Sequence, residues 1–243
     1  MTSHSIFYGE DRIDFQTVTL TDYPKRKVAI HVHPDGSVQV DAPSETTDLE
    51  IEEAVRKKAR WVLKHITEAQ QQRAQVLPRQ YISGESYFYL GRRHILKITE
   101  EPIEKASIKM LRGRLEVRCE TGNPGIIKDL LRGWYRKRAK EVFQRHLHAQ
   151  VEQIPWLKSP PPWKLVVMQK QWGSCSPKGK LSLNPHLVKA PRECVDYVLL
   201  HELCHLKEHN HSDRFYRLLD ELMPGWKAVK GKLDGMAELL LNE

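Results

Sequence analysis

One stretch decides how this chain is interpreted: His201-Glu202-Leu203-Cys204-His205, followed by Leu206-Lys207-Glu208-His209-Asn210-His211. On a helix, His201 and His205 project from one face one turn apart, so both imidazoles reach the same metal ion. Glu202 stands beside them, where it can act as a general base toward water. A zinc site needs a third ligand, and His211 is the best candidate if the helix ends before it. Asn210 tolerates the left-handed conformation and is predicted to end the helix.

The flanking sequence favours this zinc site over a chance His-Glu-x-x-His pattern in an ordinary helix. Pro191 suits a first helical position, and apolar residues recur at helical spacing from Val195 to Leu206. Ser212 is predicted to cap a second helix, which Pro224-Gly225 ends. His209 lies about 12 Å along the axis from His201 if the helix continues, so it is interpreted as a surface or outer histidine.

Several ordered motifs together resemble one protein family. His201-Glu202-Leu203-Cys204-His205-Leu206, with Asn210-His211-Ser212 and Phe215, is similar to the signature of the YgjP-like metallopeptidases, a zincin group related to the SprT-like proteases. Upstream, the resemblance extends to Gln171-Trp172-Gly173-Ser174-Cys175-Ser176 and to Tyr87-Phe88-Tyr89-Leu90-Gly91-Arg92-Arg93. The spacing of the second and third histidines equals that of the metzincins, but Glu208 stands where they have glycine, and no Met-turn is found.

The resemblance implies an α+β fold with a zincin-type core, a mixed sheet packed on the His-Glu helix, preceded by an N-terminal β-rich region. It also implies a zinc metallopeptidase in which His201, His205 and His211 hold Zn²⁺ and Glu202 is the general base. An additional donor would stabilise the oxyanion of the tetrahedral intermediate. The candidates for that donor are His186, Tyr197 and Tyr216.

Composition indicates a globular protein with no membrane span. The chain has 243 residues, of which 40% are hydrophobic and 29% charged. No run of about 18 apolar residues occurs, and the N-terminus has no hydrophobic signal core. The four cysteines, Cys119, Cys175, Cys194 and Cys204, show no paired spacing, which predicts free thiols and a cytoplasmic location.

The break at Thr121-Gly122-Asn123-Pro124-Gly125 predicts two regions, 1–120 and 121–243. In the first, residues 5–42 are predicted to be β, with a hairpin turn at Pro34-Asp35-Gly36; residues 44–72 form a long helix, and residues 81–119 are β again. In the second, the pattern predicts a helix over residues 125–153 and short strands at 165–168, 173–176 and 180–183. A C-terminal helix closes the chain.

The block Trp172-Gly173-Ser174-Cys175 has two interpretations. As an edge strand beside the zinc helix, it would receive substrate backbone by strand addition, with Gly173 allowing a close approach. In the alternative, it is a bulged strand that packs on the zinc helix. A bulge can also aim a side chain at an active site, so the two are compatible.

The net charge of +8 raises the prospect of a polyanionic partner. The candidate polyanion-binding residues are Arg132, Arg136, Lys137 and Arg138, although an ordinary solvated helix face explains them as well. Two further functions are therefore kept as alternatives to the metallopeptidase. One is a Mg²⁺-dependent nucleoside triphosphate (UTP) pyrophosphatase, an activity described for this family, although three histidines suit Mg²⁺ poorly. The other is a nucleic-acid-associated peptidase or binding protein.

Overall fold

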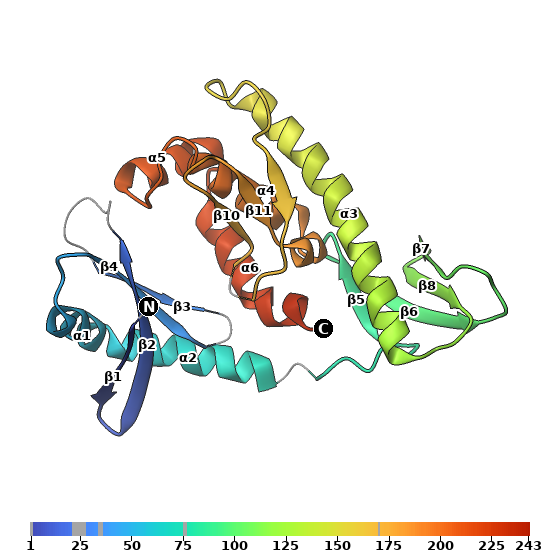
Figure 1. Ribbon diagram of the computed structural model, residues 1–243, viewed down its shortest axis with the longest axis horizontal. Coiled ribbons are helices and arrows are strands. Elements are labelled where there is room, and N and C mark those ends of the chain that lie inside the picture. Colours follow the sequence, from blue (N-terminus) through green and yellow to red (C-terminus); the bar gives the residue numbers. More distant parts are fainter. Residues whose placement is uncertain (1, 21–27, 34–35, 75–76, 170) are drawn as a thin grey trace. The chain divides into compact units, whose positions relative to one another are not determined.

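The computed structural model describes residues 2–20, 28–33, 36–74, 77–169 and 171–243. The chain divides into two compact units, Met1–Leu77 and Pro78–Glu243, each with its own hydrophobic cluster (Figure 1). The α+β architecture predicted from the sequence is confirmed. Among the described residues, no helix combines the length and the apolar character needed to cross a bilayer.

The first unit is a four-stranded sheet with two helices. Its strands are β1 (Thr2–Tyr8), β2 (Asp11–Leu20), β3 (Ala29–Val32) and β4 (Val38–Pro43), in the order β1-β2-β4-β3 with β2 parallel to β4. The predicted hairpin corresponds to β3 and β4, which are antiparallel; Pro34 and Asp35 of its turn lie outside the described residues.

The single helix predicted for residues 44–72 is two helices, α1 (Asp48–Lys57) and α2 (Ala59–Ala74). A capping box between Thr47 and Glu50 starts α1. The Lys58 amide then donates to the carbonyl of Val55 three residues back, at 3.0 Å, which tightens the turn. The helices therefore separate at Lys58, while Val55 and Val62 both stay buried.

The second unit begins with a sheet in the order β5-β6-β8-β7. Its strands are β5 (Ser86–Tyr89), β6 (Arg92–Glu100), β7 (Ser107–Leu111) and β8 (Arg114–Cys119). The inward-facing Leu96 and Leu115 belong to the same buried cluster as Ile127 and Leu131 of the helix that follows. The chain therefore divides into its compact units between residues 77 and 78. The sequence predicted a boundary between residues 120 and 121. The division falls earlier because residues 81–119 share their core with the C-terminal part.

The rest of this unit carries the site. The long helix α3 (Pro124–Gln153) leads to β9 (Trp163–Leu165), β10 (Gly173–Cys175) and β11 (Leu181–Leu183), a sheet in the order β10-β11-β9. A 3₁₀ helix, η1 (Pro185–Lys189), precedes α4 (Arg192–Cys204), α5 (Asp213–Leu222) and α6 (Trp226–Leu241). The edge strand β10 packs on α4, which places the Trp-Gly-Ser-Cys block beside the His-Glu helix.

Candidate metal centre

The first two histidines come from the end of α4. His201 lies in its last turn, and His205 is its C-cap, with ring centroids 5.0 Å apart. The helix ends at Cys204, because the amides of Leu206 and Lys207 turn back to carbonyls three residues earlier, at 3.0 Å each. The prediction that Asn210 ends the helix in a left-handed conformation is wrong: among the described non-glycine residues, positive φ occurs at Tyr81, Leu90 and Arg112.

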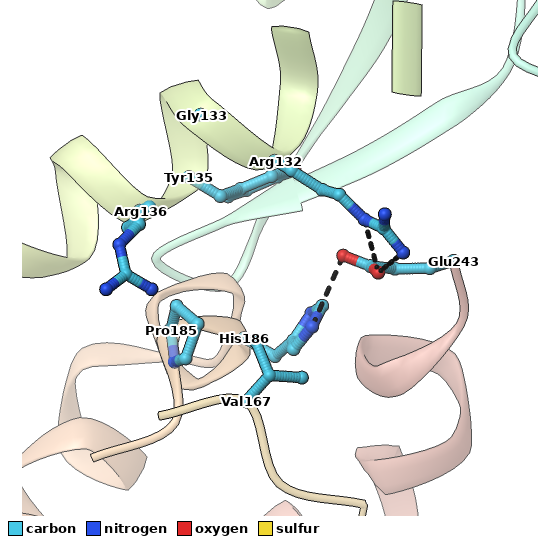
Figure 2. Close-up of a pocket in the computed structure, with 8 residues that line it drawn as sticks. All are labelled: Arg132, Gly133, Tyr135, Arg136, Val167, Pro185, His186 and Glu243. Carbon is cyan, nitrogen blue, oxygen red and sulfur yellow. Dashed lines mark hydrogen bonds and ion pairs between the residues drawn. The ribbon is translucent and has the colours of Figure 1, made fainter. Parts of the chain in front are cut away.

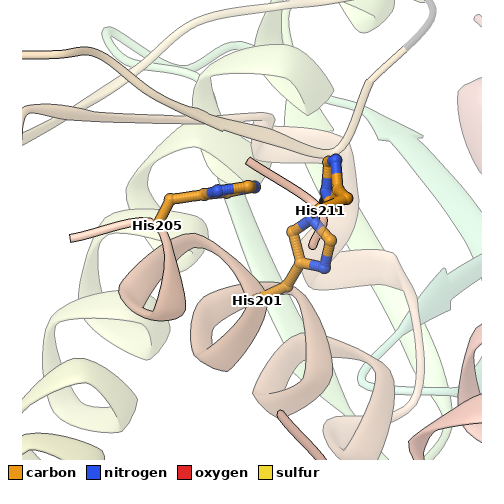
Figure 3. Close-up of side chains that lie close together, drawn as sticks. All are labelled: His201, His205 and His211. Atoms are coloured by element: carbon orange, nitrogen blue, oxygen red, sulfur yellow. Dashed lines mark hydrogen bonds between the residues drawn. The ribbon is translucent and has the colours of Figure 1, made fainter. Parts of the chain in front are cut away.

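His211 joins them from the segment just before α5. The Nε2 atoms of His201 and His211 are 3.0 Å apart, and ligand nitrogens of all three histidines lie within 4.8 Å of one another. Figure 3 shows the three rings turned toward a common point. The helix turn at residues 205–207 and the Ser212 cap of α5 together bring His211 back to the end of α4. His209 is exposed and is not part of this group.

The donor set fits a zinc ion. Zinc–nitrogen bonds of ~2.0–2.1 Å in a tetrahedral site separate the nitrogens by about 3.3 Å. His205 Nδ1–H donates to the Glu208 carbonyl at 3.2 Å, which leaves its Nε2 lone pair for a metal. His201 Nε2 and His211 Nε2 face each other, and only one of them can donate to the other. A cation would satisfy both lone pairs.

Burial keeps the two helix histidines neutral. Desolvation, followed by the neighbouring His211 and His205, lowers the pKa of His201 to about 2. Burial also lowers the pKa of His205. A metal-binding imidazole must be unprotonated, so binding at neutral pH requires no proton to leave these two rings.

Glu202 is a buried carboxyl beside this group, with 5% of its surface exposed. Burial raises its pKa to about 8. A cation held by the histidines would favour the ionised carboxylate. This is the environment of a carboxyl that exchanges protons near neutral pH.

Gly173 makes room for Glu202. A Cβ atom at residue 173 would lie 2.7 Å from Glu202 Oε1 and 2.8 Å from its Cγ. The residue before this glycine, Trp172, packs partly buried against the core, and its carbonyl accepts from the Asn184 amide at 2.9 Å. The block therefore packs on α4, as in the second interpretation of the sequence. Its role in substrate binding stays a prediction.

The other two residues of the block are partly exposed. Ser174 pairs with Ser182 across β10 and β11. Burial raises the pKa of the Cys175 thiol to about 11, so this thiol is neutral at physiological pH. All four cysteines are free thiols.

Aromatic rings that sequence reasoning did not assign to the site surround the histidines. The Phe215 ring centroid lies 4.6 to 4.9 Å from those of His201, His205 and His211. Phe215 is fixed by α5, whose Ser212 cap accepts from its amide. The sequence feature that could have placed Phe215 at the site is its position three residues after the Ser212 cap.

The three candidate oxyanion donors lie in different places. Tyr216 stacks on His211 and on Trp226, with centroids 6.1 and 5.7 Å apart, and is 38% exposed. Tyr197 is buried, 5.9 Å from the His201 ring. His186 belongs to another cavity, lined by Arg132 and Glu243 among others and by none of the three clustered histidines.

The four residues predicted to bind a polyanion all belong to α3; they are Arg132, Arg136, Lys137 and Arg138. Arg132 pairs with Glu243 at 2.8 Å, and Arg138 pairs with Glu141 at 2.9 Å. Arg136 lines the same cavity as Arg132, whereas Lys137 is exposed. Their joint role as a polyanion site stays a prediction.

Comparison with known proteins adds a family and two partial structural similarities. Residues 26–236 match a family described as YgjP-like, metallopeptidase domain. The metallopeptidase zymogen of Pyrococcus abyssi abylysin is 22% identical over 42% of this chain and 94% of its own, with a TM-score of 0.33. The metallopeptidase zymogen of Methanocaldococcus jannaschii jannalysin is 25% identical over 39% of this chain and 92% of its own, with a TM-score of 0.31. None of the curated proteins matches the sequence.

Proposed function

This chain belongs to the YgjP-like metallopeptidase family, and from that premise we propose that it is a zinc-dependent peptidase in which Glu202 is the general base. The observation that carries the proposal is the convergence of His201, His205 and His211 within 4.8 Å. A buried carboxyl, Glu202, lies directly next to His201 in the chain. Three nitrogens and an adjacent carboxyl are the donor set of zinc hydrolases.

The chain's own residues have defined parts in this reaction. Bound zinc would supply Lewis-acid polarisation of the peptide carbonyl and activation of water at neutral pH. Glu202 accepts the proton of the attacking water and returns it to the leaving amine. Gly173 leaves the space that the Glu202 carboxylate occupies.

We assign the donor for the developing oxyanion to Tyr216. It stacks on His211 and is the most exposed of the three candidates, whereas Tyr197 is buried. Removing one such donor costs ~10²–10³ in turnover in a well-studied protease. We therefore expect Tyr216→Phe to lower kcat with little change in KM or in zinc content. A variant with unchanged kcat would exclude this role.

The substrate would bind as an extended peptide along β10. This strand is an edge strand, paired with β11 on one side, and it packs on the helix that carries Glu202. Strand addition at such an edge supplies main-chain hydrogen bonds whatever the substrate sequence. In this proposal Trp172, Ser174 and Cys175 lie beside the bound peptide.

The first experiment is elemental analysis of protein purified without chelators or a histidine tag. We expect about one zinc ion per chain, lost or weakened in His211→Ala. Glu202→Gln should retain the zinc and lose casein hydrolysis. His209→Ala is the matched control, because His209 is exposed and outside the group. Full casein turnover in Glu202→Gln would overturn the mechanism, and equal zinc in His211→Ala would overturn the ligand set.

The nucleotide pyrophosphatase alternative has less support. The group of side chains that converges in the described part of the chain offers three imidazoles, whereas Mg²⁺ prefers oxygen ligands. We expect UTP hydrolysis to be absent from protein that cleaves casein. UTP turnover lost in His205→Ala would instead show that this site acts on nucleotides. The cytoplasmic location stays a prediction from the cysteines.

We propose nucleic-acid association as a second function, carried by the outward face of the β5–β8 sheet. The register places alternate residues of these strands on that face. The face carries one acidic residue, Glu116, and five exposed basic residues. The basic residues are Arg93, Lys97, Lys109, Arg114 and Arg118. Arg118 also lies 3.6 Å from Glu101. A basic face beside exposed Ile95 and Leu111 is suited to a phosphate backbone.

Salt dependence tests this second function. We expect a labelled single-stranded DNA to bind with an affinity that falls steeply with salt. Replacing Arg93 and Arg114 by Gln should reduce the slope by about 1.4, since each phosphate contact to a single strand contributes ~0.7. Lys137→Gln with Lys140→Gln on exposed positions of α3 is the matched control. A slope that falls only in this control pair would move the binding to α3.

A further inference from the structure

A second site lies in the same unit, apart from the three histidines. A cavity of about 430 Å³ lies between α3, η1 and Glu243 (Figure 2). Its polar lining comes from Arg132 and Arg136 of α3, His186 of η1 and the Glu243 carboxylate. Its volume is that of a small-molecule site. The metallopeptidase mechanism uses none of these four side chains.

The Glu243 carboxylate lines this cavity and contacts two of its other polar side chains. Arg132 donates from Nε and Nη2 to Glu243 Oε2, at 2.9 and 2.8 Å. His186 Nε2 lies 3.3 Å from the other oxygen, Oε1. Both oxygens of one carboxylate therefore face basic side chains, an arrangement typical of carboxylate and phosphate recognition.

The surroundings hold more basic groups than this one carboxylate neutralises. Lys189 is buried next to the cavity, where its Nζ donates to the Leu240 carbonyl at 2.8 Å. Burial raises the pKa of Glu243, but the Arg132 hydrogen bond and the nearby His186 and Lys189 hold it below its usual value. Arg136 has no ion-pair partner within the described ranges. Figure 2 shows its guanidinium at the opposite end of the cavity from the Arg132–Glu243 pair.

His186 forms a buried part of the cavity wall. The residue is 6% exposed, and its Nδ1 has no hydrogen-bond partner in the described part of the protein. Burial lowers the pKa of His186 to about 4, so the ring is neutral, with its Nε2 proton toward Glu243 and its Nδ1 closed off from the cavity.

We propose that this cavity binds a small organic anion whose carboxylate or phosphate group contacts Arg136, and that the Glu243 carboxylate competes with that group for Arg132. The remainder of the ligand would lie against Val167, Pro185 and Gly133, which also line the cavity. A Cβ atom on Gly133 would meet nothing within 4 Å, so this wall is open.

Isothermal titration calorimetry with phenyl phosphate and with benzoate tests the proposal. The two probes share a ring and differ in the anionic group, so their relative affinities identify which group the cavity prefers. We expect saturable binding that weakens about tenfold in Arg136→Gln, the loss of one charge-assisted contact. Lys137→Gln, the next residue on α3 and outside the cavity, should bind like the wild type.

Two further variants separate the cavity from general charge effects. Glu243→Gln removes the competing carboxylate and should tighten binding. Gly133→Leu fills the open wall and should abolish binding. Because leucine is a better helix residue than glycine, this variant is expected to fold. Zinc content should be unchanged in all of these variants, because the two sites share no residue.

The proposal would be overturned in either of two ways. One is that neither probe binds saturably to Glu243→Gln, the variant in which the cavity has lost its internal anion. The other is that Arg136→Gln and Lys137→Gln weaken binding equally, which would mean nonspecific attraction to α3. Neither result would bear on the zinc peptidase.

Discussion

Gly173 is the residue at which the catalytic role of this site can be tested without touching a titratable group. Its backbone lies against the Glu202 side chain, and a Cβ atom there would lie 2.7 Å from Oε1 and 3.0 Å from Cδ. Real Cβ atoms do not approach so closely, so any side chain at residue 173 must displace the carboxylate. The histidines approach one another independently of this contact.

We therefore predict that Gly173→Ala lowers casein turnover by at least about tenfold, because a misplaced catalytic group can cost up to about 10² in rate. Zinc content should remain that of the wild type. Gly231→Ala is the matched control: it adds the same methyl group in α6, where nothing lies within 4 Å. Equal activity in the two variants would show that Glu202 does not need its present position.

This contact also shows where sequence reasoning reaches its limit at the residue scale. His201 and His205 are one helical turn apart, so helical spacing alone predicted their shared face, with Glu202 beside them. The need for glycine at residue 173 depends on β10 packing on α4, which no local pattern records. The motif was recognised as a block, and the structure supplies the reason for one of its residues.

At the scale of elements, η1 and the end of α6 are joined through a buried cation. Lys189 donates to the Leu240 carbonyl at 2.8 Å. Burial lowers its pKa to about 7, with Glu243 raising it and Arg79 lowering it. Below pH 7 Lys189 is charged in both the folded and the unfolded state. Burying this charge then lowers the free energy of unfolding by the full desolvation cost. Between about pH 7 and 10.5 the unfolded state binds the extra proton, so stability rises with pH from this group.

We predict that Lys189→Met removes this rise. At pH 6 the variant gains from the absence of a buried charge and loses a hydrogen bond of about 1 kcal/mol. As the pH increases to 10, the wild type should gain on the variant by on the order of 4 kcal/mol. Urea unfolding at several pH values measures the difference. A constant difference from pH 6 to 10 would mean that Lys189 does not titrate in the folded state.

Elements defined by local signals were predicted well, and those defined by distant contacts were not. Ser212 caps α5, as predicted. The break predicted at residues 121–125 contains Asn123, whose side chain caps α3. In contrast, residues 165–168 were predicted as a strand, whereas β9 is Trp163–Leu165, since its pairing partner in β11 sets its position. His186 was considered for the peptidase site, and tertiary packing places it in the second cavity instead.

At the scale of the whole molecule, the three histidines and Glu202 lie in the second unit, and this unit has a hydrophobic cluster separate from that of the first. The matched family region, residues 26–236, includes parts of both units. Family membership alone therefore does not say which part of the chain holds the metal. Because Pro78–Glu243 is a compact unit that contains all four of these residues, we expect it to fold and to hold a metal ion without the first unit.

We predict that a fragment comprising residues 78–243 folds and retains about one zinc ion per chain, as measured by elemental analysis and urea unfolding. The matched perturbation in the full chain is Thr47→Ala, which removes the capping box of α1 in the first unit. It should destabilise that unit by ~1 kcal/mol and leave zinc affinity unchanged. A folded fragment without zinc, or zinc loss in Thr47→Ala, would show that the metal centre depends on the first unit. In that case the two separate cores would not correspond to two separately stable units, and the helix carrying His201 and His205 would need support from outside residues 78–243.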